Sequence, residues 1–400
     1  MDPGDVGYEP VGVKTVLVEM KDTAELLVDL AYSAVLLGSP DVAREVLELE
    51  ERMDILQLQA RMSLLMAARN PEDAEQLAPV LGVVGATEKM SDAAGDIAKV
   101  VLGEVGLPDA LRGALPEAVE TLVRGEVSAD SAYAGRTLGD INLETETGVR
   151  VIAIRRAGEW VPNPDRDTRL EADDVVLLRG PEDYVAEVYE RVTGAAYEPP
   201  AVPDPTIEDL ERAVDSIVLM KNMSELAVDL AYGAVLFDSE PVAEEVSGLE
   251  AEVDALKSRF EAWALRAAGD VEDPVSLRGL IQVAAATEVI SDAALEISEG
   301  VLRGLDAHPV VAAAVEESDE IIVRMVVAPD CALADETLGD REVRTETGMR
   351  VIAVRRPGND WVVSPGPTTE LHVGDVIVAK GTRAGAERLG ALVGDDRSFD

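Results

Sequence analysis

Cysteine, histidine and aromatic residues are scarce in this 400-residue chain, which has one Cys, two His and 3% aromatic residues. Because Cys331 has no second cysteine to pair with, an intrachain disulfide is excluded. With only His308 and His372 beside it, a zinc site of the Cys/His type is not expected either. The scarcity thus rules out a disulfide framework and argues against a Cys/His metal centre.

Long apolar runs are also lacking, and none reaches the length of a membrane span. The N-terminus, residues 1–5, has neither the basic nor the apolar region of a signal peptide. We therefore expect a soluble protein of the cytoplasm.

Basic residues are also few: the chain has 35 basic and 79 acidic residues, and its formal net charge is −44. Such a surface repels nucleic acid and anionic lipid, so no nucleic-acid partner is expected. The acids are scattered rather than run together, which favours adaptation to a halophilic cytoplasm over cation storage. Molar salt shortens the Debye length to about 3 Å and screens the self-repulsion.

What the chain does have is an internal duplication with an offset of 200 residues. Thr137-Leu138-Gly139-Asp140 returns as Thr337-Leu338-Gly339-Asp340, since 337 − 137 = 200. Residues 151–156 return in the same way at 351–356. The repeat is far longer than the periods of solenoids. A feature found in only one copy is a poor candidate for a role that both copies share.

Residues 11–104 and 206–304 carry the apolar periodicity of helices. Helix stops followed by a capping residue and a proline, such as Ser39-Pro40, divide each stretch into three. The breaks fall at residues 38–41 and 70–72 of the first copy and at 239–241 and 273–274 of the second. Each copy is predicted to hold three antiparallel helices. The proline-rich segment 199–205 is predicted to be a stiff linker.

Residues 118–195 and 316–394 have a different pattern, in which short apolar, strand-like runs are followed by one terminal helix. The runs lie at 149–155, 160–162 and 175–178 of the first copy and at 321–327, 350–355, 361–363 and 376–379 of the second. The fold class is therefore an α plus α/β multidomain protein, with two three-helix units alternating with two small α/β domains.

Carboxylates recur four residues apart on the expected helices of both copies. The pairs embedded in apolar stripes are Glu25/Asp29 and Glu88/Asp92 in the first copy, with Glu225/Asp229 and Glu288/Asp292 in the second. Each pair puts like charges on one helix face, which destabilises an isolated helix by roughly 0.2–0.5 kcal/mol. Clustered carboxylate oxygens suit Mg²⁺, Ca²⁺, Mn²⁺ or oxygen-ligated iron. A solvated face is an equally open interpretation of these pairs, and it is the favoured one for Glu50/Asp54.

Three-helix units with these Glu-x-x-x-Asp pairs resemble the PhoU family. The resemblance implies two such units in tandem, forming one bundle, and a metal-binding role for the acidic pairs. Tyr32 and Tyr232, on the same helices, are interpreted as core residues.

The other half of each copy resembles the TrkA C-terminal domain, the C-lobe of potassium-conductance regulator domains. The matching residues are Thr137-Leu138-Gly139, Gly148 to Arg156, Gly158, Leu170, Asp174 and Gly180, with Thr337-Leu338-Gly339, Gly348 to Arg356, Gly358, Leu371, Gly374-Asp375 and Gly381 in the second copy. The resemblance implies a ligand-sensing module that pairs with another copy and controls cation transport. Several members bind cyclic di-AMP between paired lobes. The chain has no Gly-x-Gly-x-x-Gly motif after a strand, so NAD binding is not expected.

Arginines that occur twice on the predicted strands are the candidate ligand-binding residues. They are Arg150, Arg155, Arg156, Arg350, Arg355 and Arg356. Arginine offers paired donors that match a phosphate group. Ion pairing is the favoured alternative, with Glu144 and Glu146 in the first copy and Glu342 and Glu346 in the second. Trp160 and Trp361 are expected to pack on the sheet, although stacking on a base stays open.

The sequence thus predicts a ligand-sensing regulator of a membrane cation channel or transporter, with potassium as the expected ion. The two C-lobes are expected to pair within the chain, a homodimer stays open, and such a partner would give a peripheral position at the membrane. The alternative is a PhoU-like metal-binding regulator that holds a divalent cation. An enzyme is not expected, because Cys331 is Ser131 in the first copy and neither His is repeated.

Overall fold

The computed structural model describes residues 13–103, 121–197, 207–303 and 320–394, except for 69, 144–146, 163, 181, 237–238, 272, 330, 358–360 and 364. The linker 199–205, His308, Glu144, Glu146 and Gly358 lie outside the described residues.

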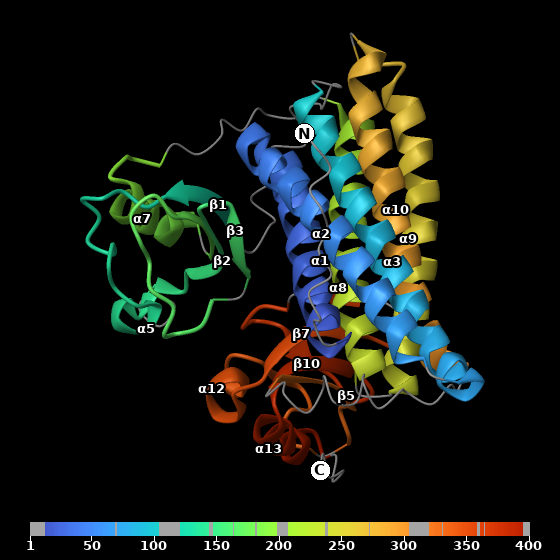
Figure 1. Ribbon diagram of the computed structural model, residues 1–400. Helices are drawn as coiled ribbons and strands as arrows, with labels where there is room; N and C mark the ends of the chain where they lie inside the picture. Colours follow the sequence, from blue (N-terminus) through green and yellow to red (C-terminus); the bar gives the residue numbers. More distant parts are fainter. Residues whose placement is uncertain are drawn as a thin grey trace.

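The helices of the two copies form one bundle (Figure 1). The first helical unit consists of α1 (Val13–Leu37), α2 (Pro40–Ala67) and α3 (Pro71–Leu102); the second consists of α8 (Glu208–Leu236), α9 (Glu240–Ala267) and α10 (Arg278–Leu302), which follows the short helix η2 (Pro274–Leu277). The predicted breaks are confirmed. Ser39 accepts a hydrogen bond from the Val42 amide at 3.3 Å and Pro40 takes the first helical position, while Asp273 caps η2.

The two helical units are joined across the middle of the bundle by tyrosines that reach into the opposite unit. The Tyr32 hydroxyl donates to Thr287 Oγ1 at 2.9 Å, and the Tyr232 hydroxyl lies 2.7 Å from Thr87 Oγ1. Both tyrosines are buried, as expected. Since a buried hydroxyl needs a partner, these bonds fix how the two units fit together.

Each of the remaining parts of the chain is a four-stranded sheet with one long helix. The first mixed domain has β1 (Thr121–Glu126), α5 (Leu138–Ile141), β2 (Arg150–Arg156), β3 (Glu159–Pro162), β4 (Val175–Gly180) and α7 (Glu182–Thr193). The second has β5 (Glu320–Val326), β6 (Glu336–Thr337), α12 (Val343–Thr347), β7 (Arg350–Arg355), β8 (Trp361–Val363), β9 (Glu370–Leu371), β10 (Val376–Thr382) and α13 (Arg383–Val393). The strand orders, β1-β4-β2-β3 and β5-β10-β7-β8, are equivalent, and all pairs are antiparallel.

The two faces of each sheet pack against different partners. One face packs against the domain's own helix, α7 or α13. The other face joins the buried core of the helices, through Leu122, Ala153 and Leu177 in the first domain and Ile352, Ala353, Trp361 and Val378 in the second. The first sheet thus lies on α1, and the second lies on α8 and α9 (Figure 1).

Pairing of the two mixed domains with each other is therefore a wrong expectation for the described residues. The apolar sheet faces are buried on the helical bundle instead, and the domains lie at two different places on it (Figure 1). The tryptophans follow the same rule. Trp361 is buried in the shared core, with the Arg355 guanidinium 5.9 Å from its ring centre, and Trp160 packs against the core as well.

Candidate functional site: a charge junction between the bundle and both sheets

In each copy, one buried glutamate of the bundle binds two arginines of the adjacent sheet. Glu45, on α2, is only 3% exposed. Its Oε1 accepts hydrogen bonds from Arg124 Nε at 2.9 Å and from Arg155 Nη2 at 2.7 Å. The hydrogen bond with Glu45 raises the pKa of Arg155 above its usual value. This carboxylate therefore attaches the first mixed domain to the helices.

The second copy repeats the same attachment. Glu245, on α9, accepts from Arg324 Nε at 2.8 Å, and it accepts from Arg355 Nε and Nη2 at 2.6 and 2.7 Å. Loss of the buried glutamate would leave two partly buried arginines of the sheet without their counter-ion.

The next arginine along each strand is bound within its own domain. Arg156 makes two bonds to Asp174, Nε to Oδ1 at 2.8 Å and Nη2 to Oδ2 at 2.7 Å. Arg356 Nη1 reaches Asp375 Oδ2 at 2.7 Å. Both aspartates are buried. Such paired, charge-assisted bonds are among the stronger ones in proteins.

Ion pairing, the alternative interpretation, thus describes four of the six predicted ligand-binding arginines. The partner expected in the second copy is wrong, because Arg355 pairs with Glu245 rather than with Glu342 or Glu346. In the first copy Arg155 pairs with Glu45. Glu45 is 110 residues from Arg155 in the chain, and only the packing of sheet on helix brings them together.

Arg150 and Arg350 occupy a different place, at the ends of β2 and β7. Directly across the strand pair, Arg150 faces Arg179 and Arg350 faces Lys380. Residues opposite each other in antiparallel strands lie on one side of the sheet, and like charges there repel. Each sheet therefore presents two cations side by side.

Four of the predicted metal-binding carboxylates meet these cations. We call this set the charge junction. It consists of Glu25, Asp29, Lys21, Glu225, Asp229 and Lys221 from α1 and α8, with Arg179 from β4 and Lys380 from β10. Arg179 Nη1 lies 2.6 Å from Asp29 Oδ2, and Lys21 and Lys221 lie 2.7 Å from Glu25 and Glu225.

Electrostatic coupling in the charge junction crosses the boundaries between domains. Burial raises the pKa of Asp229 to about 7, with a further contribution from Glu25, while Lys380 and Lys21 oppose the rise. Burial likewise raises the pKa of Glu225, and Arg179 of the first mixed domain opposes it. The junction thus joins both helical units to both sheets. Its lysines and arginine favour ion pairing of these acids over a cage of oxygen ligands for a metal.

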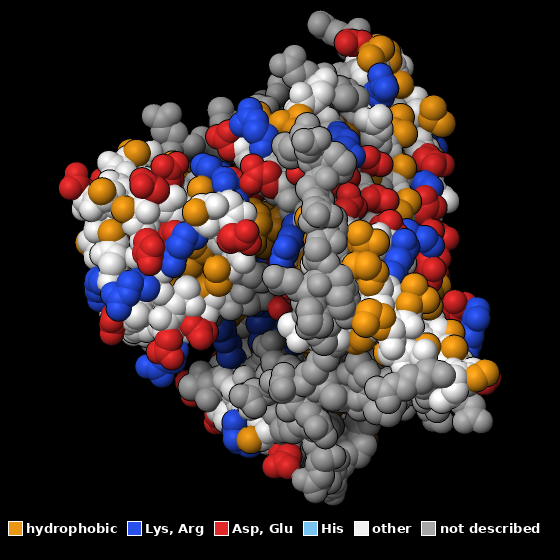
Figure 2. Space-filling view, in the orientation of Figure 1, with side chains coloured by type: hydrophobic (Ala, Val, Ile, Leu, Met, Phe, Trp, Pro, Cys, Tyr) orange, Lys and Arg blue, Asp and Glu red, His pale blue; other side chains and the backbone are white. Residues whose placement is uncertain are grey.

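The other predicted pairs lie on the outer face of the bundle, each beside a second pair. Glu88/Asp92 of α3 faces Glu50/Asp54 of α2, and we call these four the first acidic cluster. Glu288/Asp292 of α10 faces Glu250/Asp254 of α9, and these four are the second acidic cluster. Acidic side chains line this edge of α9 and α10 (Figure 2). The interpretation of Glu50/Asp54 as merely solvated missed this pairing, although its repetition in both copies was a usable signal.

The two clusters differ in their neutralisation. In the first, Lys99 lies 3.3 Å from Glu50 and Arg61 lies 3.0 Å from Glu88. In the second, Lys257 pairs with Glu288, while ligand atoms of Glu250, Asp254 and Asp292 all lie within 4.8 Å of one another. Burial, and then the neighbouring carboxylates, raise the pKa of Glu250, and the same two causes raise that of Asp292. Mutual repulsion of this kind is relieved by a hard divalent cation.

Within the described part of the chain, no helix has the length and apolarity that a bilayer crossing requires. The helices α1 to α3 and α8 to α10 instead bury one face in the shared core.

Family comparison agrees with this architecture of helical units that alternate with small sheet domains. The PhoU domain model matches residues 17–101 and 217–301, and the TrkA-C domain model matches residues 122–193 and 322–394. The chain therefore contains two PhoU domains and two TrkA-C domains in alternation. Both families are regulatory rather than catalytic.

Curated relatives share short segments of this chain. Potassium channel protein 1 of Methanocaldococcus jannaschii is 32% identical over 75 residues, which are 19% of this chain and 22% of that protein. The Ktr system potassium uptake protein A of Vibrio alginolyticus is 35% identical over 65 residues, 16% of this chain and 30% of that protein. The chain thus spans less than a third of either relative.

Among solved structures, PhoU from Pseudomonas aeruginosa is similar to this chain at 14% identity and a TM-score of 0.41. The likeness covers 73% of this chain and 96% of that one.

Proposed function

We propose that this protein regulates a potassium channel or transporter at the cytoplasmic face of a membrane. The observation that carries the proposal is the attachment of two TrkA-C domains to one PhoU bundle through Glu45 and Glu245. Relatives named as potassium channel and uptake proteins support the choice of ion. In this arrangement a change at either sheet is transmitted to the helices.

The charge junction is the element that an effector would bias. It contains four carboxylates and four basic groups from all four domains. A movement of one sheet therefore changes the electrostatic interactions that the other domains make there. An effector shifts such an equilibrium only by its difference in affinity for the two arrangements. We propose an anionic effector with phosphate groups, such as a cyclic dinucleotide, bound beside Arg150 and Arg350.

A hollow between the two mixed domains has basic side chains deep inside it (Figure 2). In a chain of net charge −44 such a position is unusual and attracts anions. The cations paired across the strands, Arg150 with Arg179 and Arg350 with Lys380, supply donors of the kind that phosphate requires.

Three measurements test this function. Deletion of the gene should change potassium flux in the host cell, and the purified chain should co-purify with a potassium transport protein. Cyclic di-AMP should raise the thermal unfolding midpoint, and Arg150→Ala with Arg350→Ala should abolish the rise. Arg44→Ala, an exposed change on α2, is the matched control. Unchanged flux together with no transport partner would refute the regulatory role.

A second candidate function is metal-dependent regulation through the second acidic cluster. Its carboxylate oxygens, from Glu250, Asp254 and Asp292, lie within 4.8 Å of one another and could bind one metal ion. Metal analysis of the purified chain should find a divalent ion that Asp254→Asn and Asp292→Asn remove. Retention of the same metal content in the double variant would exclude this cluster as the site.

A further inference from the structure

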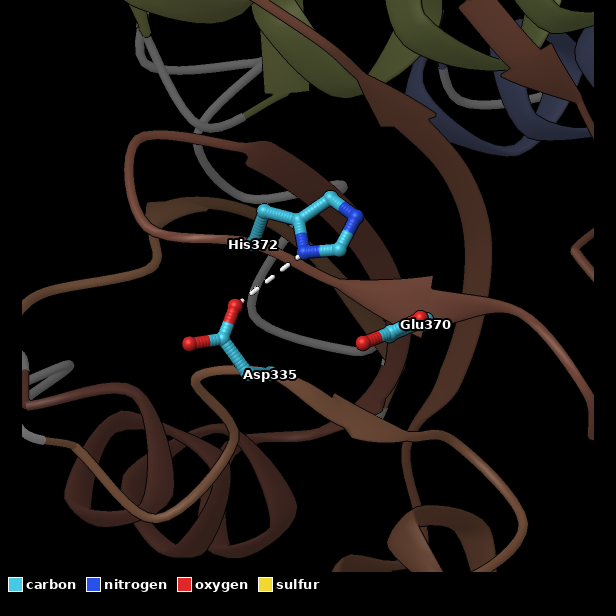
Figure 3. Close-up of side chains that lie close together, drawn as sticks. All are labelled: Asp335, Glu370 and His372. Atoms are coloured by element: carbon cyan, nitrogen blue, oxygen red, sulfur yellow. Dashed lines mark hydrogen bonds and ion pairs between the residues drawn. The ribbon is translucent and has the colours of Figure 1, made fainter.

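A second group of potential ligands lies in the second mixed domain, away from both acidic clusters and from the charge junction. The Asp335 and Glu370 carboxylates and the His372 imidazole come together at the edge of the domain (Figure 3). Their ligand atoms all lie within 4.8 Å of one another, and His372 Nδ1 is 3.2 Å from Asp335 Oδ1. All three side chains are exposed, so water has free access to any ion held there.

His372 Nδ1 and Asp335 Oδ1 are hydrogen-bonded, and the same spacing suits two ligands of one metal ion. Imidazole nitrogen and carboxylate oxygen bind zinc at about 2.0–2.2 Å, so two ligands at right angles lie about 3.0 Å apart. The separation of 3.2 Å between Nδ1 and Oδ1 is close to that value. Glu370 places a carboxylate oxygen within 4.8 Å of both atoms, so its exposed side chain is near enough to supply a third ligand.

The backbone beneath the three side chains is held rigidly. Asp375, fully buried, accepts a hydrogen bond from the His372 amide at 2.8 Å. Arg356, which is paired with Asp375, donates to the Glu370 carbonyl at 2.9 Å. The Asp335 amide donates to the Leu371 carbonyl at 2.7 Å. Because their backbones belong to one hydrogen-bonded frame, the three side chains start from fixed positions relative to one another.

The first mixed domain carries a fixed cation at the equivalent place. Its Thr137–Arg169 bridge corresponds to the pairing of Thr337 with Glu370, so Arg169 stands where Glu370 stands. The Arg169 guanidinium donates to the carbonyl of Gly135, the counterpart of Asp335. One copy therefore supplies its own positive charge, whereas the other presents two carboxylates and an imidazole.

We propose that Asp335, Glu370 and His372 form a binding site for a divalent first-row transition metal ion, with Zn²⁺ as the reference. One nitrogen and two oxygen ligands suit such borderline ions, and alkaline-earth ions prefer oxygen alone. Water completes the coordination. The site is independent of the proposed transport function and of the second acidic cluster.

Histidine NMR of the full chain tests the site directly, since the chain has only two histidines. After removal of metal with EDTA, one equivalent of Zn²⁺ should shift the ring nitrogens of one imidazole. That signal should be absent from His372→Gln. Calorimetric titration should show Zn²⁺ affinity falling by more than tenfold in Glu370→Gln and in Asp335→Asn.

Two matched controls separate this site from others. Glu171→Gln alters the residue that replaces His372 in the first mixed domain and should leave Zn²⁺ binding unchanged. Asp254→Asn with Asp292→Asn should leave the imidazole shift unchanged. The proposal is overturned if Zn²⁺ shifts neither imidazole, if it shifts that of His308, or if Glu370→Gln and Asp335→Asn titrate like the unaltered chain. Thermal unfolding of each variant confirms that it is folded.

Discussion

In the first half of the chain Lys99 and Arg61 reach the acidic cluster, whereas in the second half three carboxylates lie within 4.8 Å of one another. The mixed domains differ in the same sense, with Arg169 in the first where Glu370 stands in the second. The attachments through Glu45 and Glu245, by contrast, are the same in both. Repeated features therefore hold the architecture together, and the features that differ carry the candidate metal chemistry.

The largest effect should come from the repeated attachment. Glu45→Ala leaves Arg124 and Arg155 without their buried counter-ion, but both arginines are partly exposed. We therefore expect a loss of about 3 kcal/mol in the free energy of unfolding, the lower end of the range for a broken buried pair. Glu245→Ala should cost a similar amount. Urea denaturation measures both, and Glu51→Ala, an exposed change on α2, is the control. Costs below 1 kcal/mol would show that the glutamates do not attach the sheets.

A smaller effect should separate the two acidic clusters. Mn²⁺ at a hundred times its dissociation constant should raise the free energy of unfolding by about 2.7 kcal/mol through the second cluster. Asp254→Asn with Asp292→Asn should abolish the gain, whereas Asp54→Asn with Asp92→Asn, the matched change in the first cluster, should preserve it. Thermal unfolding with and without Mn²⁺ makes the comparison. Equal losses in both double variants would show that the clusters are equivalent.

The charge junction should respond to pH through Asp229, whose pKa is raised to about 7. The folded protein then holds a proton that the unfolded chain releases near pH 4, so stability falls as the pH rises from about 4 to 7. Asp229→Asn should flatten this decline. The equivalent change Asp29→Asn removes the ion pair with Arg179 and should destabilise the protein at pH 7. In urea denaturation at pH 7, the two variants should therefore change the free energy of unfolding in opposite directions. A change in the same direction for both would contradict the coupling.

The smallest difference concerns the tyrosines at the centre of the bundle. Tyr32 has two hydroxyl partners, Ser224 at 3.0 Å and Thr287 at 2.9 Å, whereas Thr87 is the partner recorded for Tyr232. Residue 24, the counterpart of Ser224, is Ala. Tyr32→Phe should cost about 1–1.5 kcal/mol and Tyr232→Phe about 0.5–1 kcal/mol. Calorimetric unfolding of the two variants tests the order.

Most of the fold could be predicted because short local sequence signals mark where its helices and strands begin and end. Ser39-Pro40 and Asp273-Pro274 mark helix starts by capping and by the fixed φ of proline, and the mixed half showed its strands as short apolar runs. The 200-residue offset then doubled every signal.

The candidate sites could be predicted only in part, because their members come from distant segments. Arg155 could be identified as repeated and basic, but nothing near it in the sequence points to Glu45. That pairing forms because the sheet is buried on the bundle through apolar residues such as Leu122 and Trp361. The sequence does not show whether such residues pack against helices or against a second lobe. His372 was set aside because it has no His counterpart in the first copy, and a rule based on repetition cannot find a site by which the copies differ.

The crossed tyrosine bonds bear on how such a chain arose. Tyr32 contacts Thr287 and Tyr232 contacts Thr87, so the tyrosine of each copy contacts the same threonine position in the other copy. That reciprocity is the pattern of a two-fold homodimer. A single ancestral copy would have met its twin through the same pair of residues, and the fraction of paired copies would have depended on their concentration. Fusion into one chain made the encounter intramolecular, and it freed each copy to change without its twin.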